Sequence, residues 1–437
     1  NIKILLDDAV RRGEIRVDER NTQLASMTDE VGHLVLWDNY RQNQAITLME
    51  HQSVPRLGSM AHFIRTLEAE GTLDRQVENL PTDAELSERK SRGLGLTRPE
   101  LSILLSYDKI RLYQQLLDSD VPEDPYLSKE LMRYFPLPLH EKYAANMQRH
   151  RLKREIIATA VTNSTINRMG ATFMMRMQED TGKDPGAIAK AYTAAREILD
   201  ARDFWAKIEA QDSKVTEDTQ MNAIKQIWSL LRHLTRWLLN RPGGSSGVAA
   251  NVERYQSSVS ALRSALPGVL TEKGKAAFEE NRSKWSELGL PADLSVRLAR
   301  LRVLRSALDI VEVATQTRRP IEQVASVFYE LGESLDLEWL RSQIEALPVD
   351  GHWHAQARGS LLDELNNQHR ALASQVLTAS DSGESGHSMV EAWLQRDDPT
   401  LQYTRSMLAE IFTQTADYPI ASVAVRRLAQ LAQVPLS

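Results

Sequence analysis

The sequence predicts an all-α protein, built as multi-helix bundles in two or more subdomains with little or no sheet. Three observations predict this fold class. Apolar residues recur at helical spacing along nearly all of the 437-residue chain. Glycine (20) and proline (16) are scarce, which favours helices over a turn-rich β-sandwich. No stretch has the alternating pattern of a convincing strand.

The overall composition excludes several classes of protein. Apolar content is 42% and charged content 26%, which is ordinary for a soluble globular chain. A net charge of −6 disfavours a nucleic-acid binder. With no cysteine the chain has no disulfide, no thiolate nucleophile and no thiolate-bound zinc, which fits the cytoplasm. No apolar run reaches the roughly 18–20 residues of a membrane helix. We therefore expect a cytoplasmic protein with neither a membrane nor a nucleic-acid partner.

The first elements are helices. Apolar residues at 2, 5, 6, 9 and 10 form a stripe that ends at Gly13. The chain starts within this helix and without Met, so we expect it to be part of a larger protein. After a short polar stretch, Thr28 begins a long helix running to about Ser53, and a second helix covers 54–70. The predicted inward face of the long helix holds Val31, Leu34, Val35, Asp38, Gln42, Ala45, Ile46 and Met49.

After a polar connection at 72–83, helix 97–118 is the clearest element. Thr97 and Glu100 form a capping-box pattern, in which the hydroxyl and the carboxylate each accept the other residue's amide. Two apolar rows follow, 101/104/105/112/116 and 103/107/110/117, which predicts burial on two sides. Asp108 interrupts the first row and needs a partner or a wet edge.

The remaining chain also has helical periodicity. Prolines at 118–138 predict loops around a short helix, and one helix then covers 139–169 and ends before Gly170. The stretch 241–247 is linker-like, and 380–387 is a second polar break. Further helices are predicted at 171–180, 184–201, 215–240, 250–264, 271–281, 292–315, 320–331, 335–346, 351–378, 388–395, 398–416 and 419–433. We therefore expect a helical segment at 1–83, a central bundle at 84–241 and a C-terminal bundle at 248–437.

Helix 139–169 carries two candidate contact surfaces. Its basic cluster contains Arg149, Arg151 and Arg154, which could form a solvated face, contact another domain or subunit, or meet nucleic acid. One turn apart on the same helix, Asn163 and Asn167 could bond a neighbouring helix or dock a neighbouring domain. Of these readings, an interdomain contact is the functional hypothesis.

No motif predicts catalysis within the chain. Gly93 and Gly95 form a lone G-x-G that follows no strand, so we interpret it as the loop before a helix. The run HEKYA at 140–144 lacks the second His that a zinc-protease helix needs. His352, His354 and His369 lack a convergent carboxylate or cysteine. We therefore predict no catalytic, cofactor-binding or metal-ligating residue.

Several motifs nonetheless resemble one family. They are RGLGLTRPELSILLSYDKI at 92–110, DPYL at 124–127, YFP at 134–136 and HRLKREIIAT at 150–159, followed by Asn163, Asn167 and Gly170. MTDEV at 27–31, DNY at 38–40, Gln42 with Gln44-Ala45, WLL at 237–239 and the residues around Trp353 extend the pattern. In order and spacing they resemble the helical C-terminal region of the large bacterial NAD-dependent glutamate dehydrogenases. Asp108 departs from the small residue expected in that family.

The resemblance implies an oxidoreductase of amino-acid catabolism. The full-length family converts L-glutamate, NAD and water to 2-oxoglutarate, ammonia and NADH. Its substrate lysines, catalytic Asp and dinucleotide glycines have no matching position here, which implies that catalysis and NAD binding lie upstream. The chain alone is then expected to be inactive and to bind no cofactor, with the upstream catalytic domain as its partner and a homo-oligomer as its assembly.

Two functions from different classes stay open. The first is the C-terminal region of a glutamate dehydrogenase, which acts as a scaffold, a domain-closure element or a regulatory surface. The second is a stand-alone α-helical interaction module without enzymatic activity. The sequence upstream of residue 1 would discriminate between them, because a glycine-rich βα unit there would favour the first.

Overall fold

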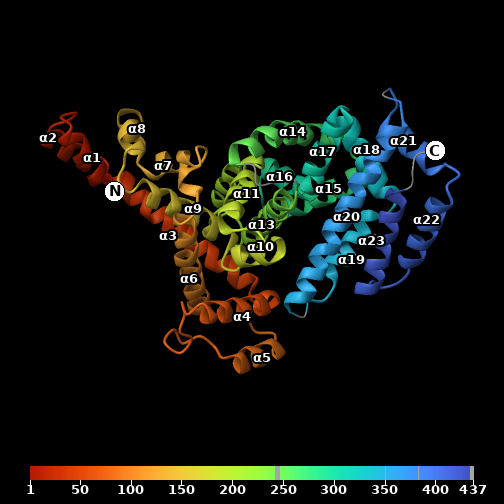
Figure 1. Ribbon diagram of the computed structural model, residues 1–437, viewed down its shortest axis with the longest axis horizontal. Coiled ribbons are helices and arrows are strands. Elements are labelled where there is room, and N and C mark those ends of the chain that lie inside the picture. The colour runs from red at the N-terminus through yellow and green to blue at the C-terminus, as the bar shows by residue number, and fades with distance from the viewer. Residues whose placement is uncertain (242–246, 350, 382, 434–437) are drawn as a thin grey trace. The chain divides into compact units, whose positions relative to one another are not determined.

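The computed structural model describes residues 1–241, 247–349, 351–381 and 383–433. All regular secondary structure in these ranges is helical, which confirms the predicted all-α class (Figure 1). None of the described helices is long and apolar enough to cross a membrane. The chain forms two compact units, with unit 1 comprising Asn1–Ala195 and Leu238–Asn251 and unit 2 comprising Arg196–Trp237 and Val252–Ser437. Most of the expected linker at 241–247 lies outside the described residues, and the three-part division stays a prediction.

Unit 1 contains the helices that hold the candidate site. They are α1 (Ile2–Arg11), α2 (Val17–Ser26), α3 (Thr28–His51), α4 (Ser53–Ala69), α5 (Asp83–Ser91), α6 (Arg98–Leu117), η1 (Val121–Glu123), α7 (Ser128–Tyr134), η2 (Leu137–Leu139), α8 (His140–Gln148), α9 (Lys153–Met169), α10 (Phe173–Thr181) and most of α11 (Pro185–Ile198).

The core of unit 1 is built around α9, which packs against α6, α3 and α7. The predicted row 101/104/105/112/116 of α6 is buried, as expected. The second row is not, because Ile110 is largely exposed. Helix α6 therefore buries one face, and the prediction of burial on two sides was wrong for this part of the helix.

Helix α2 lies in the short polar stretch between Gly13 and Thr28, where we predicted no helix. It has no buried residue, so apolar periodicity gave no signal for it. Its stability comes from its first turn, where Glu19 accepts a hydrogen bond from the Arg16 amide at 2.8 Å. Asp18 and Glu19 also place negative charge at the positive end of the helix.

The predicted single helix 139–169 is two helices, α8 and α9, and this corrects the prediction. His150 lies in the break between them. Its Nδ1 accepts the Leu152 amide at 3.1 Å, and its Nε2 donates to the Asn1 carbonyl at 3.2 Å. Burial lowers the pKa of His150, which suits a neutral ring that donates at one nitrogen and accepts at the other. The same ring thus contacts the residue before α9 and a residue 149 positions away along the chain.

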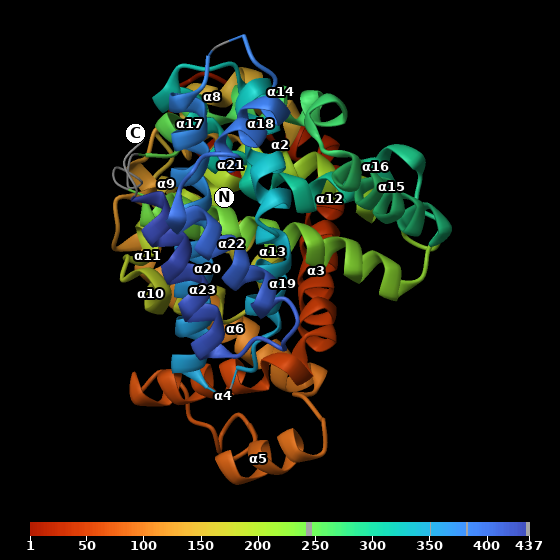
Figure 2. The same ribbon diagram turned by 90° about the vertical axis from the view of Figure 1, so that its right-hand side faces the viewer.

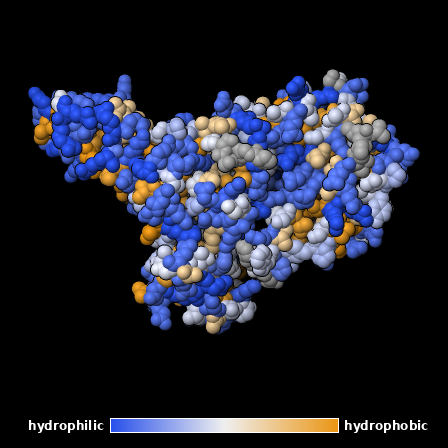
Figure 3. All heavy atoms as spheres, in the orientation of Figure 1, coloured by the Kyte–Doolittle hydropathy of each residue, from blue (hydrophilic) through white to orange (hydrophobic). Residues whose placement is uncertain are grey.

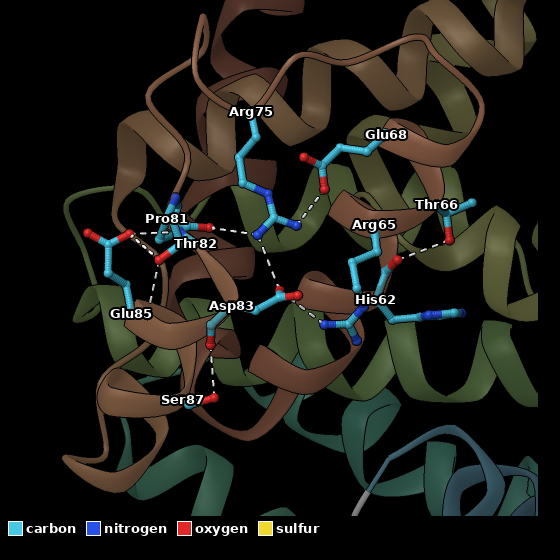
Figure 4. A network of polar contacts seen from close by, with 10 residues as sticks. All are labelled: His62, Arg65, Thr66, Glu68, Arg75, Pro81, Thr82, Asp83, Glu85 and Ser87. Atoms are coloured by element: carbon cyan, nitrogen blue, oxygen red, sulfur yellow. Dashed lines mark hydrogen bonds and ion pairs between the residues drawn. The ribbon is translucent and has the colours of Figure 1, made fainter.

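The polar connection at 72–83 is fixed by Arg75, as Figure 4 shows. The Arg75 guanidinium donates to the Glu68 carboxylate at 2.5 Å and to the Asp83 carboxylate at 3.2 Å. Glu68 lies on α4 and Asp83 begins α5. One side chain thus joins the two helices across a connection that also buries Leu73 and Leu80.

Unit 2 is organised around its longest helix, α20, which packs against α17, α18, α19 and α23 (Figure 2). Its elements are α12 (Ala201–Glu209), α13 (Glu217–Asn240), α14 (Val248–Val269), α15 (Glu272–Glu287), α16 (Ala292–Val303), η3 (Leu304–Ser306), α17 (Ala307–Thr317), α18 (Ile321–Ser334), α19 (Leu337–Ala346), α20 (His352–Ala379), α21 (Gly386–Leu394), α22 (Pro399–Ile411) and α23 (Tyr418–Ala432), of which α13 and α14 extend into unit 1. The predicted helix 292–315 is interrupted by η3.

Candidate functional site

The candidate site is a seam inside unit 1, where α1–α3 meet α6–α9. Polar contacts made by side chains cross this seam along its length, so it is held by directional bonds as well as by apolar packing. These contacts include Asn1 Nδ2 to Tyr134 Oη (2.7 Å), Tyr143 Oη to Gln23 Oε1 (2.8 Å), Asn146 Nδ2 to Glu14 Oε2 (2.7 Å), the Leu137 amide to Glu30 Oε1 (2.8 Å), Arg98 Nη1 to Glu50 Oε2 (2.7 Å) and Arg168 Nη1 to Gln44 Oε1 (2.7 Å).

The basic cluster divides between the seam and the surface. Arg149 pairs with Glu14 across the seam at 3.6 Å. Arg154 pairs with Glu123 and donates to the Leu117 carbonyl at 2.6 Å, so it holds the end of α6. Arg151 is exposed. The three arginines therefore serve different roles, and of the three Arg151 is the one suited to contact something beyond unit 1.

The amide row lies partly in the core. Asn163 is half-buried, whereas Asn167 is buried and its Oδ1 accepts no hydrogen bond from a described residue. The hydrogen bond that joins α9 to α3 comes from Arg168, the residue after Asn167. Sequence reasoning singled out the amides and missed Arg168 and its partner Gln44. An arginine two residues before a helix-ending glycine was the available signal, but its partner lies 124 residues away.

Asp108 is the most deeply buried carboxyl among the described residues of unit 1. It is fully enclosed, and neither oxygen forms a hydrogen bond of good geometry with a described residue. Burial raises its pKa to about 7, although the Arg111 charge and the nearby Thr172 amide act in the opposite direction. Arg111 itself is held by Glu70, to which it donates twice, at 2.9 and 2.7 Å. Of the two expected alternatives, a partner or a wet edge, the wet edge was wrong, because Asp108 is fully enclosed. The groups that favour its charged form are Arg111 and the Thr172 amide.

We expect Asp108→Asn to remove a pH dependence of stability. The folded-state pKa of about 7 exceeds the ordinary 3.8, so the folded chain holds the proton more tightly. Stability is then lost as pH rises from about 4 to about 7 and is constant above that range. The advantage of the Asp108→Asn variant over wild type should grow across this window to a few kcal/mol. Urea unfolding of both proteins at about pH 5 and about pH 8 measures it, and an advantage that is equal at both pH values would contradict the assignment.

The start of α6 is fixed by a buried ion pair as well as by its cap. The Thr97 amide donates to Glu100 Oε2 at 2.7 Å, and the two residues occupy the positions of a capping box. Arg89 donates to both Glu100 oxygens, at 2.7 and 2.9 Å. Burial alone would raise the pKa of Glu100, but the hydrogen bonds from Arg89 and Thr97 outweigh it and lower the pKa.

We expect Thr97→Ala to lower the free energy of unfolding by about 1 kcal/mol through loss of the cap hydroxyl. Ser106→Ala is the matched control, because Ser106 lies exposed in the middle of the same helix. Chemical denaturation of both variants gives the comparison. If Thr97→Ala shifts the midpoint no more than Ser106→Ala does, the hydroxyl contributes nothing as a cap.

The G-x-G pair lies in the loop before α6 and packs against α4. Gly93 has a positive φ of 66° with open space around it. Gly95 has no such angle, but a Cβ there would lie 2.2 Å from the Ser53 Oγ. That hydroxyl accepts the Leu96 amide at 2.5 Å. The second glycine is therefore required by close packing of a loop on a helix.

Unit 2 has its own buried polar centre. It includes Trp237, which belongs to the WLL motif at 237–239. The Trp237 indole donates to Asp309 Oδ1 at 2.8 Å, and Arg370 approaches the same oxygen at 3.1 Å. Burial raises the pKa of Asp309 to about 6, against the opposing effects of Arg370 and Trp237. The Trp237 ring meets Tyr255 edge-on at 5.7 Å. These contacts account for a tryptophan at this position.

A cleft of about 810 Å³ lies in unit 2 among residues of α13, α15, α16 and α19. Both signs of charge line it, and two ion pairs, Arg305–Glu345 at 2.5 Å and Arg302–Glu338 at 3.1 Å, lie in its wall. Burial lowers the pKa of His233 well below its usual value, and its Nε2 donates to the Arg305 carbonyl at 3.1 Å. We assign no ligand to this cleft.

The histidines weighed as metal ligands have other partners where the structure describes them. His369 donates to the Phe328 carbonyl at 2.8 Å, and burial lowers its pKa to about 3. His354 stacks on Tyr418 with ring centroids 5.2 Å apart. The side chain of His352 lies outside the described residues. Within the described chain no group of three or more His, Asp or Glu side chains is arranged to hold a metal ion.

Comparison with known proteins places both sides of the seam in one kind of protein. The family model "Glutamate dehydrogenase, C-terminal" matches residues 93–430, and "Bacterial NAD-glutamate dehydrogenase, catalytic domain" matches residues 1–49. NAD-specific glutamate dehydrogenases from Halomonas elongata and Pseudomonas aeruginosa are 38% and 37% identical over 434 residues. The enzyme of Mycobacterium tuberculosis is 30% identical over 432 residues. Each alignment covers 99% of this chain but only 26–27% of the relative, so the chain spans about a quarter of their length.

Proposed function

This chain belongs to the NAD-specific glutamate dehydrogenase family, and we propose that it forms the helical region that follows the catalytic domain of such an enzyme. In the whole protein, L-glutamate, NAD and water would give 2-oxoglutarate, ammonia and NADH. The observation that supports this proposal most is the match that runs through 99% of the chain. We place the enzyme in the cytoplasm and expect it to be a homo-oligomer.

We assign these helices the role of a scaffold that holds the catalytic domain. The seam supports this role, because it joins residues that match the two family models. Arg168 lies in the segment matching the C-terminal model, and Gln44 lies in the segment matching the catalytic-domain model. Their buried hydrogen bond, with the Arg149–Glu14 pair, gives a continuous physical connection between the two segments.

NAD binding and hydride transfer belong, in this proposal, to the part of the enzyme upstream of Asn1. Dinucleotide-binding domains are built on a parallel sheet with a glycine-rich βα turn. The described residues contain helices and no strand, which supports assigning that fold to the upstream part. Residues of unit 1 would then act on catalysis by positioning and not by touching the reacting atoms.

The surface end of α9 is proposed to contact another domain or subunit of the assembled enzyme. We expect Arg151→Ala in the full-length enzyme to lower kcat/KM for glutamate by about fivefold, since coupling between sites has typical energies of this size. Arg154 is left intact because it holds α6 within unit 1. Steady-state kinetics and the melting temperature are measured together.

Arg426→Ala is the matched control, because Arg426 is an exposed arginine on α23. It should leave the kinetics at the wild-type level. Wild-type kinetics and wild-type assembly in Arg151→Ala would contradict the proposed contact and indicate that this end of α9 is a solvated face. A fall in melting temperature with the kinetic loss would point to unfolding instead of coupling and would also count against the proposed contact.

A further inference from the structure

One apolar surface of unit 1 is left uncovered on α3. This helix has 24 residues and spans roughly 36 Å. Its buried residues are Gln44, Ala45, Leu48 and Met49, all near its C-terminal end. Leu34, Val35 and Leu36 are 37%, 56% and 68% exposed. We call these three residues the α3 outer face.

The α3 outer face covers more of the helix surface than a single exposed leucine would. Successive helical residues are turned by about 100°, so three in a row cover more than half of the circumference. Leu137 is also 73% exposed, and its amide donates to Glu30, which lies one turn before Leu34 on the same helix. Figure 3 shows hydrophobic atoms in orange on the surface of the α1–α3 segment. Contiguous apolar surface of this kind marks an interaction site.

The neighbouring aromatic residues add contact area at low entropic cost. The Trp37 ring stacks on Tyr40 at 5.0 Å and on His33 at 6.2 Å. Both Trp37 and Tyr40 are half-buried. Rings that are held in place by stacking lose little freedom when a partner covers them, which is why such residues are enriched in interfaces.

We propose that the α3 outer face is covered by the upstream catalytic domain of the same polypeptide. The proposal rests on the function proposed above. The exposed stretch lies inside residues 1–49, which match the family's catalytic-domain model. The buried end of the same helix packs against α6 and α9, which lie in the segment matching the C-terminal model. Helix α3 would thus be shared, with one end in the helical region and its outer face in the catalytic domain.

The size of the relatives supports this occupant. The chain corresponds to 27% of the Halomonas elongata enzyme, so most of that protein is available to cover the face. A second copy of this chain, or unit 2 of the same chain, would be a different occupant. Each leaves a distinct product in a crosslinking experiment.

The test places the photocrosslinker p-benzoyl-L-phenylalanine at Val35 of the full-length enzyme, and separately at Val423, which is 50% exposed on α23. After irradiation, crosslinked peptides are identified by mass spectrometry. We expect the Val35 probe to join peptides upstream of Asn1 within one subunit, and the Val423 probe to join none of them. A crosslinked dimer on a denaturing gel, a crosslink confined to residues 1–437, or no crosslink from Val35 would overturn the proposal.

The same preparations are assayed for glutamate-dependent reduction of NAD, which separates this proposal from the one that it rests on. Active enzyme without an upstream crosslink overturns the docking of the catalytic domain on α3 and leaves the proposed function intact. An upstream crosslink in a well-folded preparation that does not oxidise glutamate supports the docking and overturns the proposed function. Activity also confirms that the bulky probe has not unfolded the protein.

Discussion

Gly95→Ala is expected to lower the free energy of unfolding of unit 1 by about 3 kcal/mol, because overpacking of a rigid contact costs this much. The added Cβ would lie 2.2 Å from the Oγ, 2.6 Å from the Cβ and 2.9 Å from the backbone carbon of Ser53. Ser53 is buried, and its backbone belongs to α4. The loop before α6 must therefore move away from α4, which also weakens the bond between Ser53 and the Leu96 amide.

Gly93→Ala is the matched control for this prediction. Its Cβ meets no atom within 4 Å, but its φ of 66° is unfavourable for alanine, so the expected cost is about 1 kcal/mol. Ser53→Gly added to Gly95→Ala should recover part of the loss, since it removes two of the three clashing atoms. Urea unfolding of the three variants makes the comparison. Equal losses for Gly95→Ala and Gly93→Ala would contradict close packing as the reason for the second glycine.

Glu312→Ala is expected to destabilise unit 2 by about 1–3 kcal/mol, because it removes the acceptor of the buried Tyr255 hydroxyl. Glu312 is buried, and Arg254 donates to its two oxygens at 3.0 and 3.1 Å. The Tyr255 hydroxyl donates to Oε1 at 2.5 Å. Removing the carboxylate takes away the acceptor of a hydroxyl that lies in the protein interior. The Arg254 side chain is 43% exposed, so water can replace its lost partner.

The control is Glu279→Ala, which removes an exposed pair with Arg282 and should cost less than about 1 kcal/mol. Thermal or chemical unfolding of both variants gives the two losses. If the Glu312 variant loses no more stability than the Glu279 variant, the Arg254–Glu312–Tyr255 contacts do not stabilise unit 2 as the geometry indicates.

Much of the fold could be predicted, because the caps and apolar periodicity of a helix are visible in its local sequence. The helix expected at 97–118 is α6, Arg98–Leu117, and its start follows from Thr97, Pro99 and Glu100. The helix expected from Thr28 is α3. The break between α8 and α9 was not predicted, and the contact of His150 with Asn1 in that break has no trace in the local sequence.

The candidate site was harder to predict, as α3 illustrates. The predicted inward face of α3 runs from Val31 to Met49. It is buried at Ala45 and Met49, but Leu34, Val35 and Asp38 are exposed. Periodicity identifies an apolar face and says nothing of what covers it. The pairing of Arg168 with Gln44 was missed for a related reason, because single sequences do not reveal which distant polar residues meet.

The measurement that tests the central claim most directly is NADH formation from glutamate and NAD by two polypeptides. One is the chain of residues 1–437, and the other is the longer enzyme that carries it after the catalytic domain. We predict that the longer enzyme forms NADH, that the isolated chain forms none, and that calorimetry detects no micromolar binding of NAD to the isolated chain. NADH formation or micromolar NAD binding by residues 1–437 alone, or an inert full-length enzyme, would contradict the account.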